Sequence, residues 1–342
     1  MSAGTAVATS LAVGIDIGGT KVKVCAADVS GRILAIREIP SGPDRDARDL
    51  LHDVKACVDL VVERATDQGT AAVTVSAVGI VTPGVIGADG MGLAPNNPGM
   101  ATSVPADAIG KLLGLDRVAW ANDVKAAALA ESVWGELRGA KCGLYVNVGT
   151  GLSAGAVIGG IPLEGAHGAA LEIGYLLPSS GYVPGHRSGA APLEDLISGR
   201  ALSDRARAML GEHVSASQVL EVLNDTAGAG PRATALRRLA REFVDQWCRA
   251  VTNLAIALDP DVISVGGGVS SASTVFLPPL RAALDEYVPY PPRLVVSRTP
   301  NDLSMLGALL LAYRSLGVEV PAVSLPADRE RAEARAVPAT VA

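Results

Sequence analysis

Three buried-strand segments of this chain each run into a glycine turn, and this pattern constrains the fold more than any other feature. The turns are DIGGTK (16–21), VGTGLSAG (148–155) and VGGGVS (265–270). The first two are followed by a second apolar segment, which is typical of a strand–turn–strand hairpin. The recurrence suggests an internal duplication, and the helical segments between the strands predict an α/β fold with helices on the sheet faces.

Hydrophobic periodicity predicts the other elements. An adjacent proline pair, Pro278 and Pro279, predicts a kink or break in one of the helices. We expect strands over 11–18, 21–28, 33–40, 72–84, 116–123, 142–151, 152–160, 261–269 and 293–299, and helices over 46–67, 124–137, 232–258, 274–287 and 304–316.

The length of 342 residues predicts about two domains. We expect a flexible N-terminus (1–11), an N-terminal α/β domain (12–121), a larger C-terminal α/β domain (122–303), a terminal helix packing back on the first domain (304–317) and a disordered tail (320–342).

Composition narrows the class of protein. The net charge is -6 and aromatic residues make up 3%, so we expect no nucleic-acid partner. No apolar run reaches the roughly 20 residues that cross a bilayer, so we expect no membrane partner. The four cysteines are widely separated and favour reduced thiols in a cytoplasmic protein.

Glycine turns of this kind let a backbone approach phosphate closely. One such turn is weak evidence, because a tight hairpin also needs glycine; three together favour phosphate binding. None matches GxxxxGK[ST], so the chain carries neither that phosphate loop nor the usual dinucleotide fingerprint. Asp123, where a strand meets a helix in WANDVKAAALAE, has two interpretations: a helix cap, or a base that accepts a proton from an attacking hydroxyl.

Six segments carry a family resemblance: GIDIGGTKVKV, APNNPGM, WANDVKAAALAE, VNVGTGLSAG, GAHGAALEIGY and VISVGGGV. Their order and spacing over residues 11–317 resemble the ROK family, which includes sugar kinases and repressors. The resemblance implies a two-domain hexokinase/actin-like (ribonuclease H-like) fold. It also implies a sugar site in an inter-domain cleft, with ATP and Mg²⁺ as cofactors.

The resemblance also implies the site residues. Asp123 corresponds to the catalytic base. The positions matching sugar contacts are Asn96, Asn97, Asn122, Glu172, Tyr175 and Glu194. The positions matching phosphate or ATP contacts are Asp16, Gly18, Gly19, Thr20, Lys21, Thr150, Gly151, Gly267 and Gly268. Of these, the resemblance places Asp16 near magnesium or the transferring phosphate.

The chain departs from the family pattern in one segment. Tyr175 stands where the family has a histidine that contacts the sugar, and the following loop lacks the family's zinc-binding cysteines. We therefore expect no structural zinc, and what stabilises residues 176–192 without it is left open. Glu194 aligns with a sugar-contacting glutamate, although an acid in the first turn of a helix also suits the helix dipole.

The sequence thus predicts an ATP-dependent kinase that phosphorylates a hexose. The resemblance implies that the 6-hydroxyl is the acceptor. Glucose, kanosamine, glucosamine and N-acylhexosamines remain open as substrates, and ATP is not distinguished from another phosphoryl donor. A catalytically inactive sugar-binding or regulatory protein is the alternative. A repressor is disfavoured because about a dozen residues precede the first strand. By resemblance we expect a homo-oligomer, a dimer.

Overall fold

The structure is a computed structural model that describes residues 9–41, 47–67, 73–87, 90–93, 108–178, 184–225, 230–299 and 302–323. Its contacts divide the chain into two compact units. The first unit comprises Met1–Ala130, Gly165–Gly168 and Asp302–Ala342, and the second comprises Glu131–Glu164 and Ala169–Asn301. This division falls inside a helix, whereas the predicted boundary at 121/122 precedes that helix.

The first unit is built on a mixed five-stranded sheet with the order β3-β2-β1-β4-β7. β1, β4 and β7 are parallel, while β2 and β3 are added by antiparallel hairpins. A short hairpin, β5–β6, follows β4. The strands are β1 (Thr9–Ile17), β2 (Lys21–Asp28), β3 (Ile33–Pro40), β4 (Val73–Thr82), β5 (Val85–Gly87), β6 (Gly90–Leu93) and β7 (Val118–Asn122).

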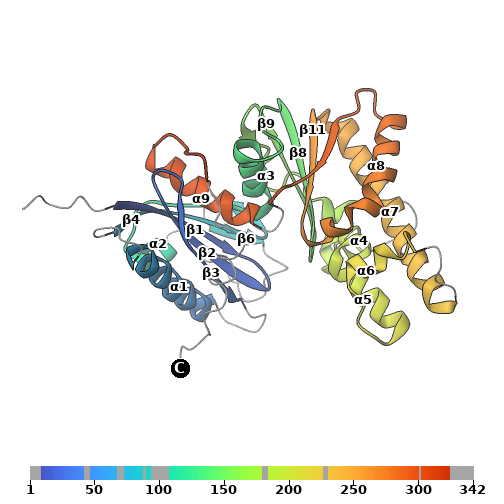
Figure 1. Cartoon of the computed structure of the whole chain (residues 1–342), viewed down its shortest axis with the longest axis horizontal. Coiled ribbons are helices and arrows are strands. Elements are labelled where there is room, and N and C mark those ends of the chain that lie inside the picture. Colours follow the sequence, from blue (N-terminus) through green and yellow to red (C-terminus); the bar gives the residue numbers. More distant parts are fainter. Residues whose placement is uncertain are drawn as a thin grey trace, which may run out of the picture. The chain divides into compact units, whose positions relative to one another are not determined.

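Helices α1 (Ala47–Asp67) and α9 (Leu303–Leu316) cover opposite faces of this sheet (Figure 1). α1 packs on β2 and β3, and α9 packs on β1 and β4. A β-carbon at Gly79 would overlap the carbonyl oxygen of Ala308, so glycine is what lets α9 lie directly on β4. The unit also contains α2 (Ala108–Leu113) and the first two turns of α3 (Asp123–Trp134).

The second unit repeats the sheet plan of the first. Its order is β10-β9-β8-β11-β12, again with three parallel strands, here β8, β11 and β12, and two added antiparallel strands. The shared topology supports the internal duplication that the glycine turns suggested. The strands are β8 (Cys142–Val148), β9 (Leu152–Ile158), β10 (Ile161–Pro162), β11 (Val262–Gly266) and β12 (Arg293–Val296).

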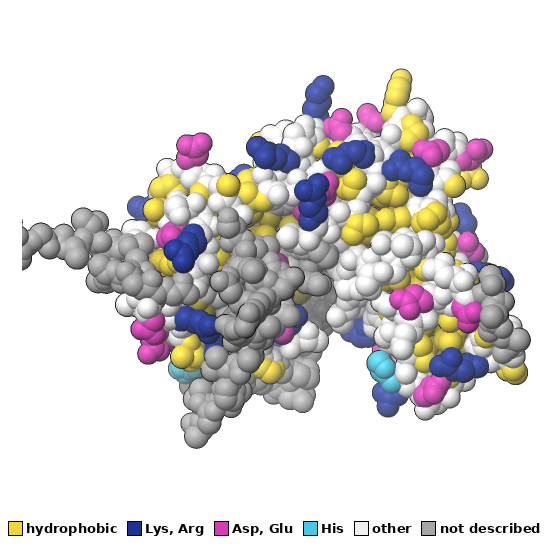
Figure 2. Space-filling model, viewed as in Figure 1, with side chains coloured by type: hydrophobic (Ala, Val, Ile, Leu, Met, Phe, Trp, Pro, Cys, Tyr) yellow, Lys and Arg dark blue, Asp and Glu magenta, His cyan; other side chains and the backbone are white. Residues whose placement is uncertain are grey.

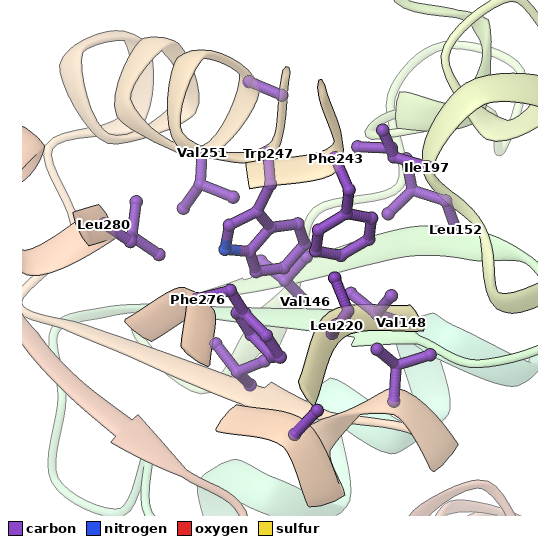
Figure 3. Close-up of a cluster of buried hydrophobic side chains, with 14 of the residues drawn as sticks. Val146, Val148, Leu152, Ile197, Leu220, Phe243, Trp247, Val251, Phe276 and Leu280 are labelled. Carbon is purple, nitrogen blue, oxygen red and sulfur yellow. The ribbon is translucent and has the colours of Figure 1, made fainter. Parts of the chain in front are cut away.

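The core of the second unit centres on three aromatic rings, Phe243, Trp247 and Phe276 (Figure 3). Their centroids lie 5.5–6.1 Å apart, and all three side chains are fully buried. The helices of this unit are α4 (Glu194–Ile197), α5 (Gly199–Leu210), α6 (Ala216–Glu221), α7 (Pro231–Leu258) and α8 (Ser273–Tyr287), with short 3-10 turns at Ile173–Tyr175, His186–Ser188 and Gly268–Ala272.

Of the kink or break expected at Pro278–Pro279, the break does not occur, and the kink stays a prediction. α8 is assigned as one helix from Ser273 to Tyr287 with both prolines inside it. Phe276, Leu280 and Leu284 of α8 are buried in the core, and α8 packs against α7. We infer that this burial outweighs the hydrogen bonds that the prolines cannot donate.

On the face drawn in Figure 2, basic and acidic side chains of the described residues are interspersed. No helix among the described residues is long and apolar enough to cross a membrane.

Candidate active site

The candidate active site of the first unit lies where its three parallel strands end. Asp16 is the penultimate residue of β1, Thr82 ends β4 and Asn122 ends β7. The register pairs Asp16 with Val81 and Thr82 with Asn122, so these residues occupy one edge of the sheet. The carboxyl ends of parallel strands are where open α/β sheets bind ligands.

Asn122 caps helix α3, which bears on the cap interpretation of its neighbour Asp123. The Asn122 side-chain oxygen accepts hydrogen bonds from the backbone N–H of Val124 and of Lys125, both at 3.1 Å. Its amide nitrogen donates to the carbonyl of Gly84 at 2.8 Å. Because Asn122 performs the capping, the cap interpretation does not account for Asp123.

Asp123 is a half-buried carboxylate with a raised pKa. One of its oxygens accepts a hydrogen bond from Val124 N–H at 2.8 Å, which favours the ionised form. Burial opposes this and raises the pKa of Asp123 to about 6, while the ammonium of Lys125 acts in the lowering direction. Lys125 is itself buried and donates to the carbonyl of Gly168. A carboxylate with a pKa near neutrality suits a general base.

Asp16 shares this environment. Burial is the main cause that raises its pKa to about 7, and the negative charge of Asp123 adds to it. Asp16 and Asp123 are thus two neighbouring carboxyl groups whose pKa values are both raised. Perturbed carboxyl pairs of this kind gather at functional sites, although structural networks also produce them.

A buried ion pair, Lys23–Asp302, lies beside Asp16. Lys23 is the cross-strand partner of Asp16 on β2, so their side chains share a face of the sheet. The Lys23 ammonium lies 3.0 Å from a carboxylate oxygen of Asp302, the residue preceding α9, and the two side chains are 4% and 11% exposed. The positive charge of Lys23 acts on the pKa of Asp16 in the lowering direction, against the larger effect of burial. Sequence reasoning missed this pair because its members are 279 positions apart.

The first glycine turn forms a tight hairpin between β1 and β2. Gly18 N–H donates to the carbonyl of Lys21 at 2.9 Å, and Thr20 accepts from Ser41 N–H. Lys21 is exposed and lies 3.3 Å from Glu38. These contacts show a hairpin and no ligand, so the phosphate role of Gly18, Gly19, Thr20 and Lys21 stays a prediction.

The other two glycine turns come together in the second unit. A β-carbon at Gly267, whose φ is +89°, would overlap the carbonyl of Val148, and one at Gly149 would lie 3.7 Å from the nitrogen of Gly268. These contacts place residues 148–151 against residues 267–268. The result is a cradle of backbone atoms with little side-chain bulk, and its phosphate role stays a prediction.

Glu194 is buried at the edge of this cradle. One carboxylate oxygen accepts a hydrogen bond from Leu152 N–H at 2.8 Å, directly after the Gly149–Gly151 turn. The other lies 3.5 Å from the guanidinium of Arg200. Glu194 therefore fastens the glycine turn in place, a role that sequence reasoning did not anticipate, and its predicted sugar contact stays a prediction.

The segment from Glu172 to Glu194 is held together by its own contacts. Leu193 N–H donates to the carbonyl of Gly174 at 3.0 Å, which joins the two ends of the loop. The rings of Tyr175 and His186 meet edge to face with centroids 5.3 Å apart. Asp195 accepts from Ala191 N–H at 3.1 Å. These contacts answer, for the described part of the loop, what stabilises it.

The surroundings of Tyr175 are acidic. Burial raises the pKa of its hydroxyl, and the carboxylates of Glu172, Glu194 and Asp195 raise it further. The predicted sugar contacts Glu172, Tyr175 and Glu194 thus lie in one neighbourhood of the second unit. Asn96 and Asn97 lie outside the described residues.

No group of three or more His, Cys, Asp or Glu side chains among the described residues could hold a metal ion. Magnesium does not need a group of three such side chains, because it takes one or two carboxylates and completes its shell with waters and substrate phosphates. The predicted absence of zinc stays a prediction.

Two features indicate the class to which the chain belongs: a duplicated α/β fold, and a glycine turn that directly follows the Asp16 carboxylate at the end of β1. The family model described as "ROK family" matches residues 12–315, and the chain belongs to this family. Structural likeness to ROK hexokinases and glucokinases confirms the predicted actin-like sugar kinase fold.

Relatives of known name span nearly the whole chain. The kanosamine kinase of Amycolatopsis mediterranei is 32% identical over 90% of this chain and 98% of its own. The N-acetylmannosamine kinase of Salmonella arizonae is 31% identical over 87% of this chain and 97% of its own. A ROK family glucokinase from Streptomyces griseus, solved with glucose and AMPPNP, has a TM-score of 0.71 at 26% identity, covering 89% of this chain and 99% of that one.

Proposed function

We propose that this protein transfers the terminal phosphoryl group of ATP to the 6-hydroxyl of a hexose or amino sugar. The enzyme class, a sugar kinase, is common to the named relatives. The observation that carries the finer proposal is Asp123, a carboxylate at the carboxyl end of β7 whose pKa is raised to about 6. A base with this pKa is ionised at neutral pH and can still accept a proton.

In the proposed reaction, a carboxylate oxygen of Asp123 accepts the proton of the sugar hydroxyl. As the proton leaves, the hydroxyl oxygen of the sugar forms its bond to phosphorus. The bond from phosphorus to the leaving ADP oxygen breaks in the same transfer. ATP supplies the phosphoryl group, and Mg²⁺ neutralises its charge. Lys125 favours the ionised form of Asp123, and Asn122 fixes the start of α3, so the carboxylate is oriented before the sugar binds.

The other predicted site residues contact the sugar, the transferring phosphate or the nucleotide. Asn122 has one amide hydrogen beyond its bond to Gly84, and that hydrogen is available to a sugar hydroxyl. Glu172, Tyr175 and Glu194 are the further sugar contacts, with Asn96 and Asn97. Asp16 and the first glycine turn serve the transferring phosphate and magnesium, and the turns at Thr150–Gly151 and Gly267–Gly268 serve the nucleotide.

The acidic surroundings of Tyr175 favour one class of substrate among those left open. Three carboxylates, those of Glu172, Glu194 and Asp195, lie close enough to raise the pKa of its hydroxyl. A sugar with a free ammonium group gains from this charge, whereas a neutral sugar does not. We therefore place unacylated amino sugars such as kanosamine and glucosamine ahead of glucose and the N-acylhexosamines.

The test is a coupled ADP-release assay with ATP and Mg²⁺ over glucose, kanosamine, glucosamine and N-acetylmannosamine. We expect sugar-dependent ADP release, with the highest kcat/KM for an unacylated amino sugar. If glucose or an N-acyl sugar is preferred, the substrate assignment is wrong while the kinase assignment stands. Sugar binding without turnover on every member of the panel would instead favour the catalytically inactive protein.

The pH dependence of kcat/KM reports the proposed base. Asp123 acts only when ionised, and its raised pKa means that half of it is protonated at about pH 6. We expect kcat/KM to fall as pH drops, with an apparent pKa of about 6. The residual activity of an Asp123→Asn variant should lack this limb. A flat wild-type profile between about pH 5 and 8 would contradict the assignment.

A further inference from the structure

The phosphate cradle of the second unit has a cation at its edge that the sequence motifs do not include. The two glycine turns, at 149–151 and 267–268, contain no charged side chain. Nucleotide phosphates carry several negative charges, and an arginine fork matches their oxygens in geometry and charge. Arg200, the second residue of α5, lies against one of these turns.

Backbone contacts fix the position of Arg200. Gly199 N–H donates to the carbonyl of Gly149 at 2.8 Å, and Arg200 N–H donates to that of Thr150 at 3.3 Å. A β-carbon at Gly199 would lie 2.5 Å from the Gly149 oxygen, so the beginning of α5 and the turn are in direct contact. Ser198 caps the helix by accepting from Ala201 N–H at 3.1 Å. The backbone of Arg200 is therefore anchored to the turn itself.

The side chain of Arg200 remains available to a ligand. It is 49% exposed, and one of its guanidinium nitrogens lies 3.5 Å from a Glu194 carboxylate oxygen. That distance makes a weak hydrogen bond, and a guanidinium has five N–H donors. Glu194 in turn is only 8% exposed, and its other oxygen accepts from Leu152 N–H. The buried carboxylate thus restrains the guanidinium beside residues 150–152.

We propose that Arg200 is a binding residue for the phosphates of the donor nucleotide and that Glu194 positions it. This inference rests on the proposed nucleotide-dependent function. The guanidinium donates to phosphate oxygens lying over the Gly149–Gly151 turn, and Glu194 holds both the turn and the arginine. Glu194 then contributes to nucleotide binding through Arg200, whether or not it also contacts the sugar.

Nucleotide binding to the full chain, measured by calorimetry with ATP, ADP and adenosine, tests this directly. We expect Arg200→Ala to weaken ATP and ADP binding by about tenfold, the size expected for a half-exposed, charge-assisted contact. Adenosine binding should be unchanged, because adenosine has no phosphate. Arg200→Lys should recover part of the loss. Arg207→Ala, an exposed arginine farther along α5, is the matched control and should bind all three ligands like the wild type.

The inference is overturned if Arg200→Ala binds ATP and ADP like the wild type, or if it loses adenosine affinity to the same extent. It is also overturned if the wild-type chain binds no nucleotide. The calorimetry is independent of turnover. A wild-type chain that binds ATP through Arg200 but phosphorylates no sugar would contradict the proposed function and leave the arginine assignment intact.

Discussion

Replacing Asp123 by asparagine should lower kcat by about 10²- to 10⁴-fold, the usual contribution of a positioned general base. Asparagine has nearly the same shape, and its side-chain oxygen can still accept from Val124 N–H, so helix α3 should begin as before. The sugar dissociation constant should change much less than kcat, since the base acts on the proton in transit. Steady-state kinetics and sugar calorimetry on the same preparation measure both quantities.

Asp116→Asn is the matched control for this substitution. Asp116 is exposed and precedes β7 in the same unit, so the same chemical change there should leave kcat unaltered. An Asp123→Asn enzyme that keeps more than about a tenth of wild-type kcat would remove Asp123 from the base role. A loss confined to KM would instead assign Asp123 to sugar binding.

The sheet architecture was readable from sequence because its signals are local. Alternating apolar residues and glycine turns predicted the β1–β2 and β8–β9 hairpins, and each formed where its turn was expected. The Pro278–Pro279 pair was misread because a local rule for proline takes no account of the core that α8 completes through Phe276 and Leu280. Packing between distant segments is the information that periodicity lacks.

The candidate site also contains residues with a local sequence signal and contacts between distant residues that have none. Asp123 and the glycine turns stand in short, recognisable motifs, whereas Lys23–Asp302 and Lys125–Gly168 join residues 279 and 43 positions apart. The position of Lys23 itself had a local signal, because counting outward from the DIGGTK turn places it opposite Asp16, but nothing local pointed to Asp302. The Tyr175–His186 contact carried none, since a ring pair across a loop has no fixed spacing.

Removing the ammonium of Lys23 should destabilise the protein more than any surface substitution. In a Lys23→Met variant the carboxylate of Asp302, 11% exposed, would stay buried without its cation. Breaking a buried ion pair from one side typically costs about 3–5 kcal/mol, because the remaining charge keeps its desolvation penalty. Urea unfolding at neutral pH, followed by circular dichroism, should show this as a lower unfolding midpoint with an unchanged slope.

Two comparisons separate the charge effect from other consequences of the substitution. Lys55→Met removes the cation of the exposed Lys55–Asp59 pair on α1, whose side chains are 39% and 61% exposed, and should cost at most about 0.5 kcal/mol. Adding Asp302→Asn to Lys23→Met removes the stranded charge and should recover a substantial part of the stability. If the double variant is as unstable as the sum of the two single variants, the ion pair is not what stabilises this site.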